Sequence, residues 1–549
     1  MAGRVGRMGQ AAAEGNVIIT ADSATTSARA LKFMDFESQE ELGAGINPDD
    51  FNLLTLQLFA GKLCSSRREA FELLASTLSA ARELERNRSG VAHWESHLNS
   101  QIDRLLRSGC LIEGRGRIGV TAFGLSVARS GLKAETALYF INSLVENGSN
   151  LISLLPGTED ALEEDDILFI LAHAALSSPE FSYEGGNPTR QISYRVGRPN
   201  LVTNEYARKL DALLFNRPWA ADVSAANGAL LIVDWAAGLT RGRIERRVAG
   251  VRLGTVESLA RDVGWILTGI SETLSDVTAP TLADESKPDA LRGDGPAVAA
   301  SRQLARSIRR MATRIASGLP SEVLWMTNLE LLGARKRLNR QQILSLRFQG
   351  LVKPMALMDG GGEADDKRRL ALSATAGAGA ALPNQVRDAA RRWKATERDH
   401  SKQHHLKRAG KVEIGELISN LYLHRGNALE AVFEAVMSSI SVTCEKLDHA
   451  NKQAHPDFLI TIEDFPPIVV EIKSKASDSD LVSLNAAAEV LVASELIGLK
   501  GNFCLTLCSP GVEPNVPGLV ERCGRLCVIE ATRACRRLDG LAGLAFSFL

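Results

Sequence analysis

The chain has 549 residues, and its 64 basic and 65 acidic side chains leave a formal net charge of −1 at pH 7. Such a length exceeds what one hydrophobic core organises, so we expect roughly three to four domains. No apolar run approaches the roughly 20 residues of a membrane-spanning helix, and no signal sequence opens the chain, which predicts a cytoplasmic protein without a membrane partner. The near-zero net charge neither favours nor excludes nucleic acid, because a basic face can be balanced elsewhere.

The first residues, MAGRVGRMG, place two arginines three positions apart, and a strand-like run, GNVIITAD, follows. This pattern resembles the last motif of superfamily 2 helicases, Q-x-x-G-R-x-G-R, although the chain starts inside the motif and lacks its Gln. The resemblance implies that residues 1–25 are a remnant of the second RecA-like domain. It also implies that Arg4 and Arg7 would contact nucleotide phosphates, which suits planar, permanently charged guanidinium groups. The alternative is a chance glycine- and arginine-rich tail.

The other parts of an ATPase motor are missing from the sequence. It contains neither a G-x-x-x-x-G-K-[ST] phosphate loop nor a D-E-x-H box. We therefore expect ATP to act only through a missing or separate motor domain. Helicase or ATPase activity is not expected from this chain alone.

Residues 46–132 are predicted to form helices followed by a short β-hairpin. Apolar residues recur at helical spacing in FNLLTLQLFAGKLCSSRREAFELLAST, and Trp94–Ser108 is a further amphipathic helix. The runs Gly109–Ile112 and Ile118–Thr121 would form the hairpin. This order is that of a winged helix. The run RIGVTAFGLSVARSGLKAETALYF resembles the wing and following helix of DEAD/DEAH-type helicases that carry winged-helix and ratchet modules.

Residues 133–278 are helical by their apolar period. The segments DWAAGLTRGRIERR and TVESLARDVGWILTGISETL resemble the ratchet bundle of the same helicases, whose helices stack on single-stranded DNA. The resemblance makes Trp235, Arg261 and Trp265 candidate DNA contacts, with Asp234 as a further position to test. A tryptophan on a helix is more often a core residue, which is the alternative for both aromatic side chains.

Two further stretches precede the second half of the chain. Residues 279–297 are polar and contain Pro and Gly, which predicts a flexible insertion. Residues 298–353 resemble the helix-hairpin-helix piece that closes such helicases, with Leu329–Arg335 at the hairpin position. Arginines recur there at helical spacing, so Arg306 and Arg310 are candidate phosphate contacts, and a solvated helix face is the alternative.

Residues 354–410 are predicted to be a linker and a basic helix. Residues 354–388 are rich in Gly, Ala and Asp, which is typical of a flexible linker that would let the next domain swing. From Arg391 to Lys411 the chain is dense in Lys, Arg and His. These cations either track phosphates or form a solvated helix face.

Within residues 411–549, Asp457 and Glu471 are separated by thirteen residues that include two apolar runs around a Pro-Pro turn, LITIEDFPPIVV. This predicts a β-hairpin with Asp457 at the start of one strand and Glu471 and Lys473 on the next. Side chains at i and i+2 share one face, so Glu471 and Lys473 point the same way while Ile472 enters the core. Two converging carboxylates suit Mg²⁺ or Mn²⁺, and a neighbouring lysine orients water or offsets charge on phosphate.

The D-x13-E-x-K spacing resembles the PD-(D/E)xK nuclease superfamily, which has the restriction-endonuclease-like fold. The segment GNALEAVF resembles its first core helix, which implies that Glu430 is a third metal ligand. Downstream, the helix-like run Asn485–Ile497 and the strand-like runs Asn502–Cys508 and Arg525–Glu530 fit its αβ core. The alternative is an ordinary β-hairpin with surface charges.

The sequence thus predicts a multidomain chain, mainly α (winged helix plus helical ratchet bundle) followed by an α/β restriction-endonuclease-like domain. We expect a metal-dependent deoxyribonuclease in which Asp457, Glu471 and Lys473 are catalytic and Asp457, Glu471 and Glu430 bind the metal ion. The expected partners are DNA, single-stranded or forked, and a helicase motor chain. The alternatives are a truncated ATP-dependent helicase or a non-catalytic DNA-binding subunit whose motor is on another chain. A role in genome defence or repair would rest on analogy of fold alone.

Overall fold

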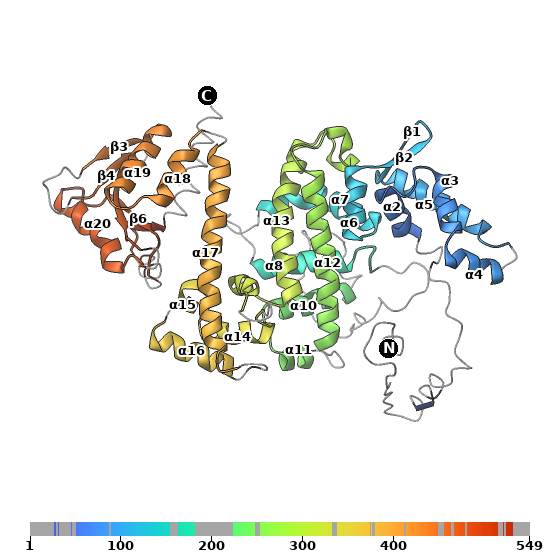
Figure 1. Ribbon diagram of the computed structural model, residues 1–549, viewed down its shortest axis with the longest axis horizontal. Helices are drawn as coiled ribbons and strands as arrows, with labels where there is room; N and C mark the ends of the chain where they lie inside the picture. The colour runs from blue at the N-terminus through green and yellow to red at the C-terminus, as the bar shows by residue number, and fades with distance from the viewer. Residues whose placement is uncertain are drawn as a thin grey trace, which may run out of the picture. The chain divides into compact units, whose positions relative to one another are not determined.

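The structure is a computed structural model that is mostly helical and ends in a five-stranded mixed sheet (Figure 1). Apart from single positions, it describes residues 51–86, 89–153, 163–181, 223–247, 253–331, 337–358, 360–373, 379–410, 413–447, 455–462, 466–477, 480–513 and 523–530. Two compact units are formed, Met1–Val233 with Glu245–Ala312 and Asp234–Ile244 with Thr313–Leu549. The predicted helicase remnant, with Arg4 and Arg7, lies outside the described residues. None of the described helices is long and apolar enough to cross a bilayer.

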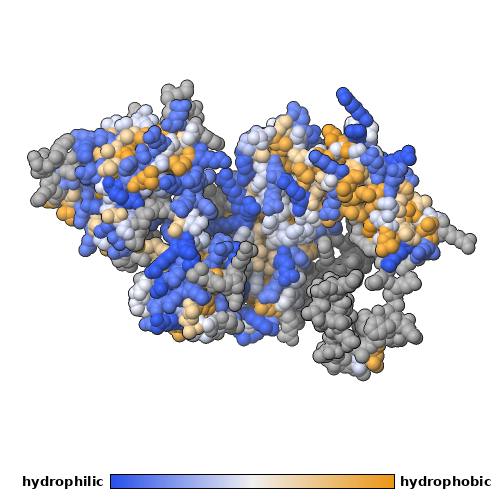
Figure 2. All heavy atoms as spheres, viewed as in Figure 1, coloured by the Kyte–Doolittle hydropathy of each residue, from blue (hydrophilic) through white to orange (hydrophobic). Residues whose placement is uncertain are grey.

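The first unit begins with helices and a hairpin in the predicted order. The elements are α2 (Phe51–Ala60), α3 (Arg67–Ala75), α4 (Leu78–Arg86), α5 (Ala92–Arg107), β1 (Leu111–Gly114), β2 (Arg117–Val120) and α6 (Ala122–Ser130). The indole of Trp94 is buried and meets Phe51 edge-on at 5.6 Å between ring centroids. The predicted helices and hairpin are confirmed, whereas the winged-helix identity stays a prediction. Figure 2 shows apolar residues gathered over these helices. Leu63, Leu78 and Leu84 are exposed apolar side chains of this segment.

The remaining described residues of the first unit are mainly helical, as the apolar period predicts. Its elements are α7 (Ala134–Ser153), α8 (Glu164–Leu176), most of α10 (Val223–Ala236), part of α11 (Arg241–Arg247), α12 (Leu253–Val277) and most of α13 (Gly295–Ser317). Helix α8 is buried from Asp166 to Leu176, as expected of a helix that is apolar on every side.

The predicted flexible insertion, residues 279–297, forms compact turns in the structure. Two 3-10 turns, η7 (Asp284–Ser286) and η8 (Asp289–Leu291), lead into α13. The carboxylate of Asp284 accepts hydrogen bonds from Lys287 Nζ at 2.9 Å and from the Gly293 amide at 2.8 Å, and Leu291 is fully buried. These contacts order a segment whose composition alone indicates a loop.

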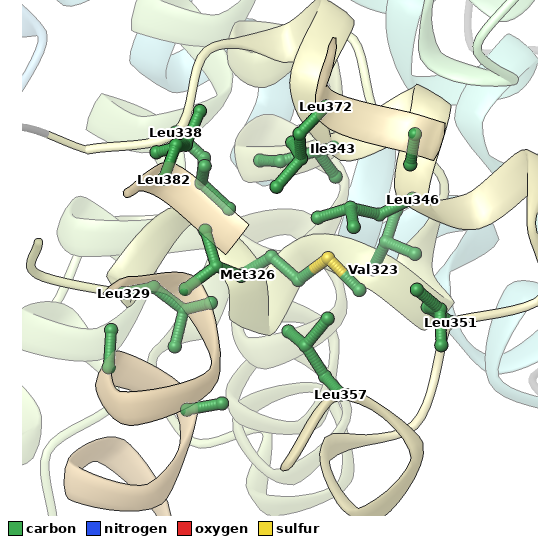
Figure 3. Close-up of a cluster of buried hydrophobic side chains, with 14 of the residues drawn as sticks. Val323, Met326, Leu329, Leu338, Ile343, Leu346, Leu351, Leu357, Leu372 and Leu382 are labelled. Carbon is green, nitrogen blue, oxygen red and sulfur yellow. The ribbon is translucent and has the colours of Figure 1, made fainter. Parts of the chain in front are cut away.

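The expectation of a flexible linker over residues 354–388 is wrong. This stretch forms α15 (Pro354–Met358), α16 (Gly362–Ser373) and the start of α17 (Leu382–Ala409). They pack with η9 (Ser321–Asn328) and α14 (Arg340–Phe348) around one core, in which Met326 and Leu346 meet Leu357, Leu372 and Leu382 (Figure 3). Apolar residues spaced between the Gly- and Ala-rich positions therefore supply enough buried surface to fold the segment.

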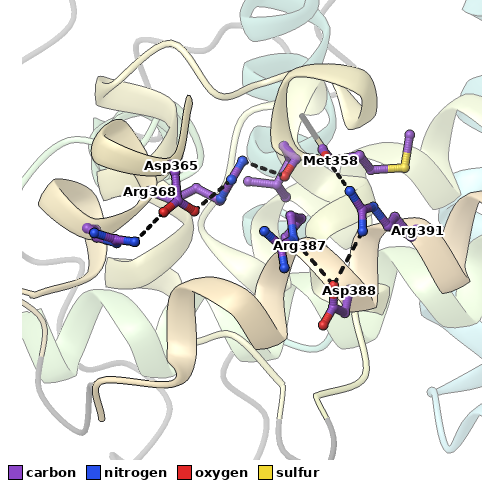
Figure 4. Close-up of polar contacts among 8 residues, drawn as sticks. Met358, Asp365, Arg368, Arg387, Asp388 and Arg391 are labelled. Carbon is purple, nitrogen blue, oxygen red and sulfur yellow. Dashed lines mark hydrogen bonds and ion pairs between the residues drawn. The ribbon is translucent and has the colours of Figure 1, made fainter. Parts of the chain in front are cut away.

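Buried charge ties the same helices together. Arg368 is fully buried; it donates to the Leu357 carbonyl at 3.0 Å and pairs with Asp365 at 3.0 Å. On α17, Asp388 lies between two arginines, Arg387 and Arg391 (Figure 4). The two contacts of Arg368 satisfy both terminal nitrogens of the buried guanidinium, whereas its Nε has no hydrogen-bond partner among the described residues. The bond to the Leu357 carbonyl joins α16 to α15.

Trp235 belongs to the core of the second unit. Its Nε1–H donates to the Ile315 carbonyl at 2.9 Å, and the guanidinium of Arg340 lies 3.9 Å from the ring centroid. Arg340 in turn donates to the carbonyl oxygens of Gly318 and Trp235, at 2.7 and 2.9 Å. Gly318 has φ of +65° and presses on the indole so closely that a Cβ atom there would overlap Trp235 and Arg340.

Replacing this glycine should therefore destabilise the second unit. We expect Gly318→Ala to lower the free energy of unfolding by about 2 to 4 kcal/mol, because left-handed strain adds to overpacking of the indole. Gly350→Ala is the matched control, since Gly350 has φ of +76° and nothing within 4 Å of the added Cβ; it should cost about 1 kcal/mol. Urea titration followed by tryptophan fluorescence measures both, and equal losses would contradict the packing argument.

The five-stranded sheet has the order β3-β4-β5-β6-β7, antiparallel between β3, β4 and β5 and parallel from β5 to β7. The strands are β3 (Thr443–Lys446), β4 (Phe458–Thr461), β5 (Ile468–Ser474), β6 (Phe503–Ser509) and β7 (Leu526–Glu530). Helices α18 (Gly415–Leu423) and α19 (Asn427–Ser439) share a core with Val470 and Ile472, whereas α20 (Leu484–Leu496) packs on Val469. Neighbouring residues of a strand face opposite sides, so the helices cover both faces of the sheet. The predicted hairpin, helix and two later strands are confirmed.

Candidate active site

Strand register brings the two predicted carboxylates together. Phe458 of β4 pairs with Val470 of β5 in an antiparallel ladder, so one step further places Asp457 across from Glu471. The amide of Ile472 donates to Asp457 Oδ2 at 2.5 Å, which fixes the aspartate side chain beside β5. The carbonyl oxygen of Asp457 accepts a hydrogen bond from the Leu447 amide at 2.9 Å. The aspartate is therefore held through both its main chain and its side chain.

Both carboxylates are buried, with 7% of Asp457 and 8% of Glu471 exposed. Burial raises the pKa of Asp457 to about 7, and the charges of Glu471 and, more weakly, Glu430 add to the rise. The hydrogen bond from Ile472 and the charge of Lys473 oppose that shift without cancelling it. The site thus concentrates negative charge that its own residues do not fully offset, which is the condition that a bound cation relieves.

Lys473 lies beside the carboxylate pair, as its i+2 spacing from Glu471 predicts. Its Nζ is 2.8 Å from Glu471 Oε1 and 2.7 Å from Glu489 Oε2. Burial alone would lower the pKa of Lys473, but hydrogen bonds to Glu471 and Glu489, together with their charges, outweigh burial and raise it. Lys473 therefore keeps its proton and acts as an ammonium group.

Glu430 lies in the first turn of α19, and its carboxylate pairs with Lys446 of β3 at 3.2 Å. The Lys446 ammonium also lies 5.9 Å from the centroid of the Phe458 ring. Among the residues that the structure describes, no group of three or more His, Cys, Asp or Glu side chains is placed to hold a metal ion. The structure therefore brings Asp457 and Glu471 together but does not gather Glu430 with them.

Sequence reasoning missed Glu489 and Lys446. Glu489 stands in the Ala-rich run NAAAEVLV, and Lys446 stands in a short run that separates α19 from the hairpin. Neither position has a motif spacing relative to Asp457 or Glu471. A helix that joins two parallel strands lies over the sheet that contains them. The predicted strand–helix–strand order could therefore have indicated that an acid on α20 lies near Lys473, and no other signal in the sequence does.

The predicted aromatic DNA contacts separate into one buried and one accessible side chain. Trp235 is 6% exposed, with its indole covered by Arg340, so the structure does not offer it as a base-stacking surface. Asp234 beside it is also buried. Trp265 is 37% exposed, although its Nε1–H donates to the Ser130 carbonyl at 2.9 Å. Arg261 lies one turn earlier on the exposed face of α12, so Arg261 and Trp265 are neighbours on that face. Their predicted contact with DNA stays a prediction.

The arginines of α13 do not form one uniform basic row. Arg310 is exposed and pairs with Glu164 at 2.8 Å, whereas Arg302 donates to the Thr278 carbonyl and Arg314 is buried. Arg306 is exposed. At the predicted hairpin of the following segment, residues 332–336 lie outside those that the structure describes. Arg306 and Arg310 are thus both accessible, but a phosphate would have to replace Glu164 as the partner of Arg310.

No protein family model matches the chain, and no curated protein resembles its sequence at a significant level. The chemistry of the site is therefore argued from Asp457, Glu471 and Lys473 themselves. Two buried carboxylates and an ammonium group within hydrogen-bonding distance of one of them can bind a hard divalent cation and a phosphate oxygen side by side.

The raised pKa of Asp457 makes a prediction about stability in the absence of divalent metal. A group with a raised folded-state pKa contributes stability that is fully present below its unfolded-state pKa and is lost as pH rises through its folded-state value, here about 7. Asp457→Asn cannot ionise. Its stability relative to wild type should therefore grow by on the order of 2 kcal/mol between about pH 5 and about pH 8.

Hydrogen exchange of the β4 and β5 amides in EDTA, corrected for intrinsic exchange rates, measures this difference locally. The exposed Asp399→Asn serves as the control, because it changes the same chemical group far from a buried carboxylate. A stability difference between Asp457→Asn and wild type that does not change with pH would show that the fold does not raise the pKa of Asp457.

Proposed function

We propose that this chain is a metal-dependent deoxyribonuclease that hydrolyses DNA phosphodiester bonds, with its active site at Asp457, Glu471 and Lys473. The observation that carries the proposal is the pair of buried carboxylates on adjacent strands, with the ammonium of Lys473 2.8 Å from one of them. The hairpin followed by a crossover helix and two parallel strands agrees with the resemblance to PD-(D/E)xK nucleases. That agreement supports the assignment at the level of fold.

The residues present fit a hard divalent cation such as Mg²⁺ or Mn²⁺. Asp457 and Glu471 supply oxygen ligands, and the strongly raised pKa of Asp457 marks a place where negative charge is not offset by the protein. When bound, such an ion would supply activation of a water molecule and stabilisation of charge on the phosphate. Glu430 would join as a third ligand only after its ion pair with Lys446 opens.

The protein's own groups then have distinct roles. The Ile472 amide holds the Asp457 carboxylate in place, and the strand holds Glu471 opposite it. Lys473 stays protonated, so it does not serve as the general base. Its ammonium donates hydrogen bonds to the attacking water or to the phosphate, where negative charge develops during hydrolysis.

The helical part would hold DNA. Trp265 and Arg261 on α12, and Arg306 and Arg310 on α13, supply an aromatic surface and cations that suit single-stranded or forked DNA. The succession of helices, a hairpin and a helical bundle is compatible with a winged-helix and ratchet module derived from a helicase. A motor chain that binds ATP would then be a separate partner.

A second candidate function is a non-catalytic DNA-binding subunit whose motor lies on another chain. One observation favours it: Glu430 is held by Lys446, so the described residues of this domain do not gather three acidic ligands at one point. The two candidates differ in whether DNA is cut.

A cleavage assay separates them. Wild type should cut labelled single-stranded, duplex or forked DNA with Mg²⁺ or Mn²⁺ and not with EDTA. Asp457→Ala and Lys473→Ala should each lower the rate by about 100-fold or more, because each removes a group that acts on the reacting phosphate. Lys475→Ala is the control, since Lys475 is an exposed lysine two residues from Lys473. Tight DNA binding without cutting by wild type would favour the non-catalytic subunit.

Lys446 should compete with the metal ion for Glu430. We expect Lys446→Met to tighten Mg²⁺ binding by about threefold to tenfold, because it removes an ion pair that is 3.2 Å long and keeps the aliphatic stem over Phe458. Calorimetric titration with Mg²⁺ alone measures this without any cleavage. Unchanged or weaker binding would show that Glu430 has a structural role and is not a ligand.

A further inference from the structure

Glu489 is the group at the site that neither the sequence motif nor the proposed metal chemistry explains. It projects from the second turn of α20, and its carboxylate lies 2.7 Å from Lys473 Nζ. Its side chain is 60% exposed, whereas that of Glu471 is 10% exposed. Lys473 is therefore held from two directions, by a buried carboxylate on its own strand and by an accessible carboxylate on the helix that crosses that strand.

The position of Glu489 is fixed by contacts that lead back to the strand carrying Glu471. Thr506 of β6 stands beside Glu471 in the parallel ladder, and its hydroxyl donates to the Ala487 carbonyl of α20 at 2.6 Å. Thr506 is fully buried, and Val490 packs against Val469 in the core beneath the helix. Because these contacts anchor the turn that carries Glu489, its carboxylate has a defined place above β5.

The two carboxylates leave one donor of Lys473 uncommitted. An ammonium group has three N–H donors, and Glu471 and Glu489 each accept one of them. If Glu471 also binds a metal ion, its charge is shared with that ion and its hold on Lys473 weakens. Glu489 stands outside the pair of buried carboxylates, so it can hold Lys473 without sharing its charge with a metal ion bound by that pair.

We infer that Glu489 is a positioning residue, which holds the Lys473 ammonium beside the carboxylate pair so that its remaining N–H faces the scissile phosphate or the attacking water. This inference rests on the proposed nuclease function and assigns a part of that same site. Glu489 does not touch the reacting atoms; it acts through Lys473. The effect of removing it should therefore appear in the turnover rate and leave metal binding and substrate affinity nearly unchanged.

The test is Glu489→Gln in the full chain, compared with wild type on the same DNA and with Mg²⁺. We expect kcat to fall by about 10- to 100-fold while KM changes by less than about twofold, because a misplaced ammonium loses an interaction made in the transition state. Glu489→Asp keeps the charge on a shorter stem and should recover part of the lost rate. Calcium binding, measured by calorimetry with Ca²⁺ alone, should match wild type.

Glu495→Gln is the matched control. Glu495 lies on the same helix, is 47% exposed and pairs with Arg525 at 3.2 Å, away from the carboxylate pair. It should lose an equivalent surface ion pair without a change in kcat. Equal rates for Glu489→Gln and wild type would overturn the inference while leaving the nuclease intact. A wild-type protein that never cuts DNA would overturn the proposed function, and the inference with it.

Discussion

The C-terminal domain depends on one constraint, which is that β4 and β5 place two carboxylates across from each other in a nearly water-free position. Asp457 and Glu471 are each less than a tenth exposed. Moving an ionised carboxylate out of water costs on the order of several kcal/mol, unless hydrogen bonds or ion pairs compensate for the lost hydration. The compensation is partial: one main-chain hydrogen bond to Asp457 and the shared ammonium of Lys473 leave the pKa of Asp457 at about 7. An arrangement that weakens the fold in this way is typical of a site retained for binding or catalysis.

The rest of the domain supplies the apolar packing that such a site requires. Residues of β5 alternate in direction, so Val470 and Ile472 pack with α18 and α19 while Val469 packs with α20. Glu471 and Lys473 follow the parity of Val469 and therefore face the α20 side. The same alternation explains why Glu489 of α20 reaches Lys473, and why Lys446, opposite Phe458, meets Glu430 of α19 instead. The Lys473–Glu489 ion pair therefore involves α20 on one face of the sheet, and the Lys446–Glu430 ion pair involves α19 on the other.

Much of this domain was predictable because its signals are local. Two apolar runs around Pro466-Pro467 predict the hairpin, and the spacing of Asp457, Glu471 and Lys473 then follows from the period of a strand. Glu489 and Lys446 could not be found in this way, because their contacts depend on how α20 and β3 lie over the hairpin. The error over residues 354–388 has a similar cause: Leu357, Leu372 and Leu382 are too widely spaced to mark a core until α15, α16 and α17 come together. The sequence likewise does not show that Trp235 is covered, because the covering residue, Arg340, lies more than a hundred positions later in the chain.

Helix α17 shows how far charge alone can be used to assign a nucleic-acid surface. Its sequence is dense in cations, but Arg391 and Arg392 donate to the main-chain carbonyls of Met358 and Glu330. In the exposed turns that follow, Glu397 and Asp399 stand among the cations, so the local field is mixed in sign. A phosphate track requires cations that are both accessible and not offset by neighbouring acids, and this helix meets that condition poorly. Lys473 differs because Glu471 and Glu489 fix its position beside a buried carboxylate pair, whereas the exposed cations of α17 have no comparable fixed place.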